Sequence, residues 1–225
     1  MYKEIDPKTL SRYSSFKYFS NFDNPCYGFN VEIDITKIFY LTKYRQESIF
    51  INLLYIVCLS LNEIPEMRMR LLDDGRLIIH DIINPGYLVM TDSGAFENCG
   101  HKMSPNYETF YNRASKEIES NKHKKKIREV YNDSSRLFDE FYITCIPWLE
   151  FTSISHPIPT HSKGLQSVPR VTWSKFYEKN NRVFTTLNIN VSHALVDGKQ
   201  LSDAFLLIQE NLNKTSSLLK RKELN

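Results

Sequence analysis

The residues best suited to chemistry lie in the segment Asn188-Ile-Asn-Val-Ser-His-Ala-Leu-Val-Asp-Gly198. His193 is in phase with Leu187, Ile189 and Val191, so we expect it to project from the apolar face of a strand where that strand ends. A histidine held with a fixed orientation in a partly dry site can act as a general base near neutral pH. The pattern also suits a structural histidine at a strand end, because three fixed positions are a weak signal.

Two elements must position this histidine. Alternating apolar residues predict a strand over 182–191, and apolar residues at helical spacing predict an amphipathic helix over 201–212. Asp197 and Gly198 interrupt the chain between the strand and the helix. The histidine is therefore expected at a strand-to-helix turn.

The rest of the chain alternates between strands and helices. Pro65 should stop a buried helix, and Asp73-Asp74-Gly75 should form a hairpin turn. These elements predict an α/β (α+β) fold, a two-layer sandwich in which a mixed sheet packs against helices. No repeat or linker divides residues 1–225, so we expect a single domain. The expected strands are 27–36, 67–71, 76–81, 87–91, 141–152 and 168–176, and the expected helices are 46–62 and 107–131.

The composition excludes several classes of protein. The chain has 225 residues, with 29 basic and 26 acidic side chains, and its net charge of +3 does not by itself imply a nucleic-acid or membrane partner. The longest apolar run, 49–61, is shorter than the about 20 residues that span a bilayer. The four cysteines form no CxxC pair, and the histidines have no metal-ligand spacing. We expect a cytoplasmic protein without a metal site.

The segment around His193 resembles the active-site motif of chloramphenicol acetyltransferases, CoA-dependent acyltransferases with a His-x-x-x-Asp-Gly signature. Three other segments resemble that family in the same order along the chain. They are Leu10-Ser11-Arg12 with Phe16, then Pro65-Glu-Met-Arg-Met-Arg70 followed by 74–81, then Ile146-Pro147-Trp148-Leu-Glu-Phe151. The resemblance covers about residues 5–213.

What the resemblance implies is an O-acetyltransferase that uses acetyl-CoA as co-substrate, acts on a small-molecule acceptor and confers antibiotic resistance. It also implies a homotrimer in which each active site combines the histidine of one protomer with pocket residues of its neighbour. Chloramphenicol is the leading acceptor, and another alcohol or amine is the alternative.

The resemblance also assigns roles to individual residues. His193 would deprotonate the acceptor hydroxyl, and Thr144 would hydrogen-bond the tetrahedral oxyanion at a position where the family has serine. Asp197 would be structural, paired with Arg12 to brace the turn that carries the histidine. Lys175 would lie near CoA. The acceptor pocket would draw on Phe19, Cys26, Phe96, Ile154, Arg170 and Thr172, for most of which ordinary packing is the alternative.

Several positions depart from the family pattern. Ser192 replaces a histidine, Val196 a cysteine, and Lys199-Gln200 an aromatic residue and a histidine. His156 and Arg170 stand where the family tends to have apolar pocket residues. These departures keep a second hypothesis open, a non-catalytic binding homologue that retains the fold.

A basic run over 122–128 also has two interpretations. It could bind the phosphates of CoA or RNA, or it could be a solvated helix face or an exposed loop, since no aromatic residue interrupts the lysines.

Overall fold

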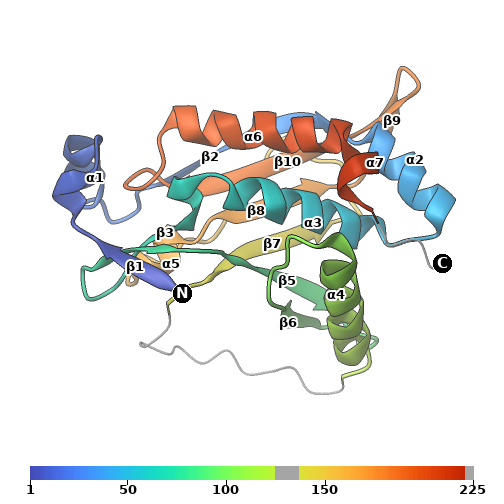
Figure 1. The fold of residues 1–225 in the computed structure, drawn as a ribbon, viewed down its shortest axis with the longest axis horizontal. Helices are drawn as coiled ribbons and strands as arrows, with labels where there is room; N and C mark the ends of the chain where they lie inside the picture. The colour runs from blue at the N-terminus through green and yellow to red at the C-terminus, as the bar shows by residue number, and fades with distance from the viewer. Residues whose placement is uncertain (125–136, 221–225) are drawn as a thin grey trace.

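The computed structural model describes residues 1–124 and 137–220. Helices α3 and α6 run side by side over one face of a large sheet, and α4 packs against α3 (Figure 1). The predicted α/β sandwich with a mixed sheet is confirmed. The helices are α1 Tyr13–Phe19, α2 Thr36–Arg45, α3 Ile49–Asn62, α4 Tyr107–Lys122, α5 Lys163–Ser167, α6 Gly198–Asn213 and α7 Thr215–Leu218, with 3-10 turns at Pro7–Thr9 and Pro65–Arg68.

The large sheet has the order β2-β10-β8-β7-β5-β6, with β9 paired to β10, and a small sheet has the order β1-β4-β3. β7 runs parallel to β5 and β8, whereas the other neighbours are antiparallel. The strands are β1 Tyr2–Ile5, β2 Cys26–Asp34, β3 Met69–Leu71, β4 Leu77–His80, β5 Asn84–Met90, β6 Phe96–Gly100, β7 Glu140–Ile146, β8 Arg170–Ser174, β9 Tyr177–Lys179 and β10 Arg182–Ser192.

The two faces of the large sheet differ because side chains alternate along each strand. Leu187 of β10 lies opposite Val31 and Trp173, and this apolar face packs against the helices. Asn188 lies opposite Asn30 and Thr172, so the second face is polar. The site residues are divided between these two faces.

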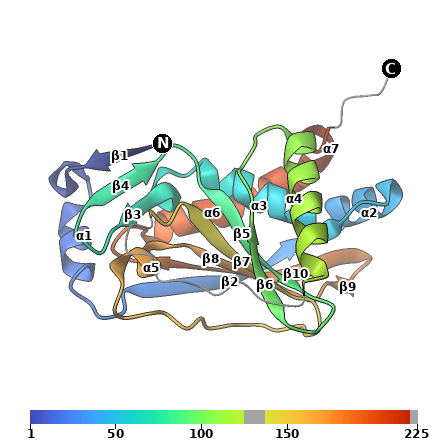
Figure 2. The same ribbon diagram turned by 90° about the horizontal axis from the view of Figure 1, so that it is seen from below.

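An extended segment between β7 and α5 covers the polar face. Its Ile154 backbone N–H donates to Asn30 Oδ1 at 3.3 Å, and His156 Nε2 lies 2.9 Å from Asn188 Oδ1. Figure 2 shows the segment running along the side of the sheet that faces away from α3 and α6. Asn188 is therefore only 2% exposed although it is polar.

The predicted helix over 46–62 begins too early. Gln46 adopts a left-handed conformation (φ 55°) that ends α2, and the Ser48 hydroxyl accepts a hydrogen bond from Ile51 N at the start of α3. The predicted strand over 27–36 ends at Asp34, whose carboxylate accepts a hydrogen bond from Thr36 N at 2.8 Å. The sequence did not predict the separate helix α2, which lies between the predicted strand and the predicted helix.

Other predicted boundaries also shift. β7 ends at Ile146 rather than at residue 152, because Pro147 has no N–H to continue the ladder. β8 spans only Arg170–Ser174, and α4 is described as far as Lys122, so most of the basic run over 122–128 lies outside the described residues. The hairpin is confirmed: β3 pairs with β4, and Gly75 in their turn has a φ of +87°.

Candidate active site

The turn over 193–197 joins β10 to α6, and Arg12 holds it from a distant part of the chain. Arg12 Nε donates to Asp197 Oδ2 at 2.8 Å, and Nη2 contacts Asp197 Oδ1. Nη2 also donates to the His193 carbonyl at 2.8 Å, and Nη1 donates to the Ala194 carbonyl. A guanidinium with a fixed fork of donors can satisfy a carboxylate and two carbonyls together. Arg12 therefore fixes the turn from His193 to Asp197.

The His193 ring packs against two aromatic rings. It stacks on Phe19 of α1 with centroids 3.8 Å apart and an interplanar angle of 9°, and Tyr27 of β2 lies 4.5 Å away at a tilt of 31°. The backbone N–H of His193 donates to the Pro25 carbonyl at 2.9 Å. The side chain remains 31% exposed. The imidazole is thus held in orientation but open on one edge.

The two ring nitrogens of His193 have different surroundings. Nδ1 is buried and lies 3.2 Å from Asp197 Oδ1. A carboxylate at this distance favours the tautomer with its proton on Nδ1, which leaves the lone pair on Nε2. Nε2 is therefore the nitrogen able to accept a proton from a substrate.

Asp197 also shapes the start of α6. Its backbone N–H donates to the Gln200 side chain at 3.2 Å, a contact typical of a capping box. Lys199 forms an exposed i,i+4 pair with Asp203 at 2.6 Å. Two departures from the family motif, Lys199 and Gln200, therefore support the start of α6.

We expect Asp197→Asn to lower both stability and rate, since it weakens the clamp on the turn. The Asp197 side chain is 34% exposed, so solvent screens part of the interaction, and the loss should be about 1–2 kcal/mol in the free energy of unfolding. Asp203→Asn, which removes the exposed pair with Lys199, is the matched control and should change neither. A loss of rate with unchanged denaturant unfolding would assign Asp197 a direct chemical role.

The same substitution should change how stability depends on pH. The hydrogen bond from Arg12 is the main reason that the pKa of Asp197 lies below its usual value. A carboxyl group with a lowered pKa stabilises the folded state above its unfolded pKa of about 4 and loses that contribution as pH falls through the folded pKa. The difference in free energy of unfolding between the wild type and Asp197→Asn should therefore be largest at neutral pH and shrink in acid. Denaturant unfolding at about pH 7, 5 and 3 measures it.

Sequence reasoning missed Tyr27. Its hydroxyl donates to the Val196 carbonyl at 3.2 Å, so it braces the same turn as Arg12. Burial raises the pKa of Tyr27 to about 12, which keeps the hydroxyl protonated as a donor. The sequence feature that could have identified Tyr27 is its place in the alternating pattern with Phe29 and Val31, on the strand that pairs with β10.

Thr144 lies far from His193 within one chain. It is in register with Thr172, which is opposite Asn188, and Asn188 precedes His193 by five residues. Two strand spacings and five residues of rise put their Cα atoms roughly 19 Å apart. One substrate oxygen cannot contact both side chains of the same protomer.

Four predicted pocket residues lie along the polar face of the sheet or above it. Cys26 donates through Sγ to the Gln166 carbonyl at 3.4 Å, and burial raises its thiol pKa to about 11. Thr172 is fully buried, and its hydroxyl has no partner among the described residues. Arg170 is 7% exposed, and Ile154 is half-buried in the covering segment. This group is separate from Phe19, which packs directly on His193.

Phe96 and Lys175 line a different feature, a mainly apolar cleft of about 560 Å³ at the opposite end of β8 from Arg170. Trp148 contributes to the same cleft, and its ring lies 6.3 Å from that of Phe96. Cys145, the neighbour of Thr144 on β7, also lines it. The cleft is therefore near Thr144 and remote from His193.

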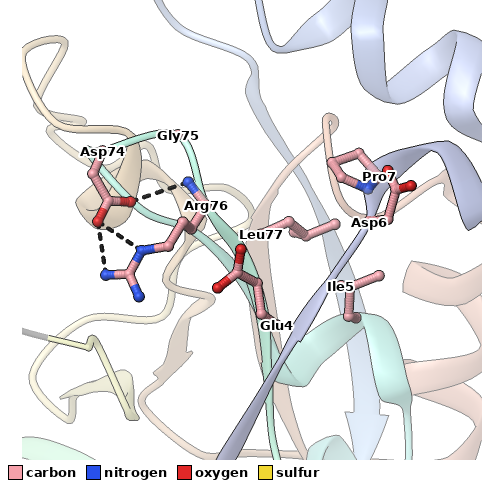
Figure 3. Close-up of a pocket in the computed structure, with 8 residues that line it drawn as sticks. All are labelled: Glu4, Ile5, Asp6, Pro7, Asp74, Gly75, Arg76 and Leu77. Carbon is pink, nitrogen blue, oxygen red and sulfur yellow. Dashed lines mark hydrogen bonds and ion pairs between the residues drawn. The ribbon is translucent and has the colours of Figure 1, made fainter.

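A second hollow lies between the start of the chain and the turn of the β3–β4 hairpin (Figure 3). Two of its charged residues, Asp74 and Arg76, pair with each other at 2.7 Å, and none of the predicted site residues lines it. It is therefore not a candidate for the active site.

Residues 1–124 and 137–220 form neither a cluster that could hold a metal ion nor a helix that could cross a membrane. That part of the chain contains no group of three or more His, Cys, Asp or Glu side chains placed to hold a metal ion. None of its helices combines the length and apolar character that a membrane span requires.

Comparison with known proteins places this arrangement in one family. The family model for chloramphenicol acetyltransferase matches residues 1–209. Chloramphenicol acetyltransferases of Bacillus pumilus and Proteus mirabilis are 26% and 27% identical to the chain, covering 88% and 86% of it and 87% of each relative.

Solved structures agree on the fold. A chloramphenicol acetyltransferase superposes with a TM-score of 0.81 at 23% identity, covering 94% of this chain and 100% of that one. A dihydrolipoamide acetyltransferase of Azotobacter vinelandii has a TM-score of 0.64 at 15% identity, covering 92% and 88%. Because the family model matches nearly the whole length of the chain, the chain belongs to the chloramphenicol acetyltransferase family of acyltransferase enzymes.

Proposed function

We propose that the chain is an acetyl-CoA-dependent O-acetyltransferase in which His193 is the general base. The observation that carries the proposal is the fixed imidazole of His193, with Nδ1 beside Asp197 and Nε2 free to face a substrate. Nε2 takes the proton of the acceptor hydroxyl as its oxygen attacks the thioester carbonyl of acetyl-CoA. When the tetrahedral intermediate collapses, the C–S bond breaks, and the proton passes from His193 to the leaving thiolate.

We further propose that the complete site forms between protomers of a homotrimer. The support is the separation of roughly 19 Å between Thr144 and His193 in one chain, which excludes a site containing both side chains of the same protomer. In a closed cyclic oligomer, the histidine of one chain can face the threonine of the next. The Thr144 hydroxyl would then donate to the oxyanion.

The apolar cleft beside Thr144 is the proposed binding site for CoA. Lys175 is exposed at its wall and can pair with a phosphate, and the exposed Trp148 ring offers a surface for stacking or apolar contact. Cys145 lines the cleft and follows Thr144 on β7, but the two side chains point to opposite faces of the sheet. A thioester in the cleft would therefore reach the proposed oxyanion donor past the end of β7.

The proposed function is tested by incubating the protein with acetyl-CoA and a panel of alcohols and amines and following the release of free thiol. Turnover that depends on an acceptor supports it. No turnover with any acceptor, together with no binding of CoA, would favour the non-catalytic homologue. Of the departures that suggested that alternative, Lys199 and Gln200 support α6, and Ser192 is buried at the end of β10.

With chloramphenicol as acceptor, we expect slow acetylation, mainly through a raised KM. Arg170 and His156 make the proposed acceptor pocket polar, and a buried guanidinium is costly to desolvate beside a neutral substrate. Arg170→Ile should lower the KM for chloramphenicol with a smaller effect on kcat. Steady-state kinetics test this, and a micromolar KM for the wild type would contradict it.

A further inference from the structure

We propose that the acceptor carries a carboxylate that binds to Arg170, an inference that rests on the proposed acetyltransferase function. Arg170 begins β8 on the polar face of the sheet, where it lies opposite Asn190 and two residues before Thr172. It is 7% exposed, so its charge is largely removed from water. A buried charge is retained in proteins when it has a partner.

The guanidinium of Arg170 has too few partners within the described residues. Nη1 donates to the Val168 carbonyl at 3.1 Å and Nη2 to the Leu165 carbonyl at 2.9 Å. The side chain carries five N–H donors, and in the part of the chain that the structure describes no carboxylate approaches it within ion-pair distance. The guanidinium carbon also lies over the face of Tyr142, 5.7 Å from the ring centroid.

Arg70 shows how this fold satisfies an arginine that is purely structural. It is fully buried, and it donates to the carbonyls of Phe138, Met67, Met69 and Glu140 from all three of its nitrogens. Arg170 has only two carbonyl partners for the same number of donors. The difference suggests that Arg170 keeps its remaining donors for a ligand.

The titratable groups around Arg170 do not supply the missing negative charge. Burial raises the pKa of Cys26 to about 11, so its thiol is neutral at physiological pH. Asn188 donates its amide to Phe29 and Asn30, so its Oδ1 accepts a hydrogen bond from His156 Nε2. Burial lowers the pKa of His156, which leaves it neutral. The ligand itself must therefore be the anion.

Thr172 provides the second observation. Its hydroxyl is fully buried without a partner among the described residues, on the same face of β8 as Arg170. Successive residues on one face of a strand are about 7 Å apart, which lets an arginine and a hydroxyl bind two oxygens of one ligand. A carboxylate offers oxygen acceptors to both side chains and matches the fork of the guanidinium.

The test compares two acceptors that differ only in charge, 4-(hydroxymethyl)benzoate and its methyl ester. The wild type should prefer the carboxylate by about 10- to 100-fold in kcat/KM. Arg170→Met should remove that preference by raising the KM for the acid, with kcat nearly unchanged, and Arg170→Lys should restore part of it. Arg76→Met, which removes an exposed arginine that already pairs with Asp74, is the control and should leave the preference intact.

Calorimetric titration of the acid into protein saturated with CoA gives a readout independent of turnover. Binding that Arg170→Met weakens by at least tenfold supports the proposal. Equal use of acid and ester by the wild type would overturn it while leaving the acetyltransferase function standing, whereas loss of turnover with every acceptor and no binding of CoA would overturn both. A changed oligomeric state in Arg170→Met with unchanged preference would also overturn it, because Arg170 would then bind another protomer.

Discussion

Replacing His193 with Ala or Gln is expected to lower acetyl transfer by about 10²–10⁴-fold and leave the fold intact. General-base catalysis by a positioned side chain contributes a factor of this size. The side chain of His193 is 31% exposed, and its ring lies beside the Asp197 carboxylate and the rings of Phe19 and Tyr27. Neither substitution therefore opens a large buried cavity. The measurement is thiol release at saturating acetyl-CoA, with circular dichroism as the test of folding.

His161→Ala is the matched control for this substitution. His161 is exposed and lies in the segment before α5. It should transfer acetyl groups at the wild-type rate. A His193→Gln variant that also kept the wild-type rate would show that another group removes the proton.

Thr144→Val is expected to lower kcat by about 10²–10³-fold with little change in either KM. One oxyanion donor is typically worth this much, and valine keeps the shape of threonine while removing the hydroxyl. Thr144→Ser should retain activity, because serine keeps the donor and removes the methyl group that restricts its rotation. Steady-state kinetics distinguish the two variants. A Thr144→Val enzyme with unchanged kcat would exclude Thr144 as the donor.

Mixed oligomers test whether the two residues act from different protomers. Neither His193→Ala nor Thr144→Val should be active alone, but trimers assembled from equal amounts of both should regain about one quarter of the sites. This fraction follows because half of the chains supply an intact histidine and half of their neighbours an intact threonine. Trimers of His193→Ala and the double variant are the control and should stay inactive. Inactive mixed trimers, shown by two affinity tags to contain both chains, would contradict the shared site.

Local patterns in the sequence determined much of the fold. The alternation in 182–191 depends only on neighbours two residues apart, and β10 follows it almost from end to end. The helix over 201–212 and the hairpin around Gly75 are likewise encoded by short-range spacing. Short-range spacing does not encode the boundary between α2 and α3. The segments on both sides of it favour helix, and the left-handed conformation of Gln46 leaves no periodic signal.

For the site, the motif and its resemblance to one family were enough to select His193, Asp197 and Arg12. Only the tertiary structure decided how the remaining residues are distributed. Arg12 and Asp197 are 185 positions apart and come into contact, whereas Thr144 on β7 and His193 just after β10 belong to one sheet region and do not. The physical reason is that residue spacing sets which face of a strand a side chain occupies, but strand order and register set its neighbours across the sheet. The scarcity of partners for Arg170 was equally invisible in the sequence, because it depends on which distant segments cover the polar face.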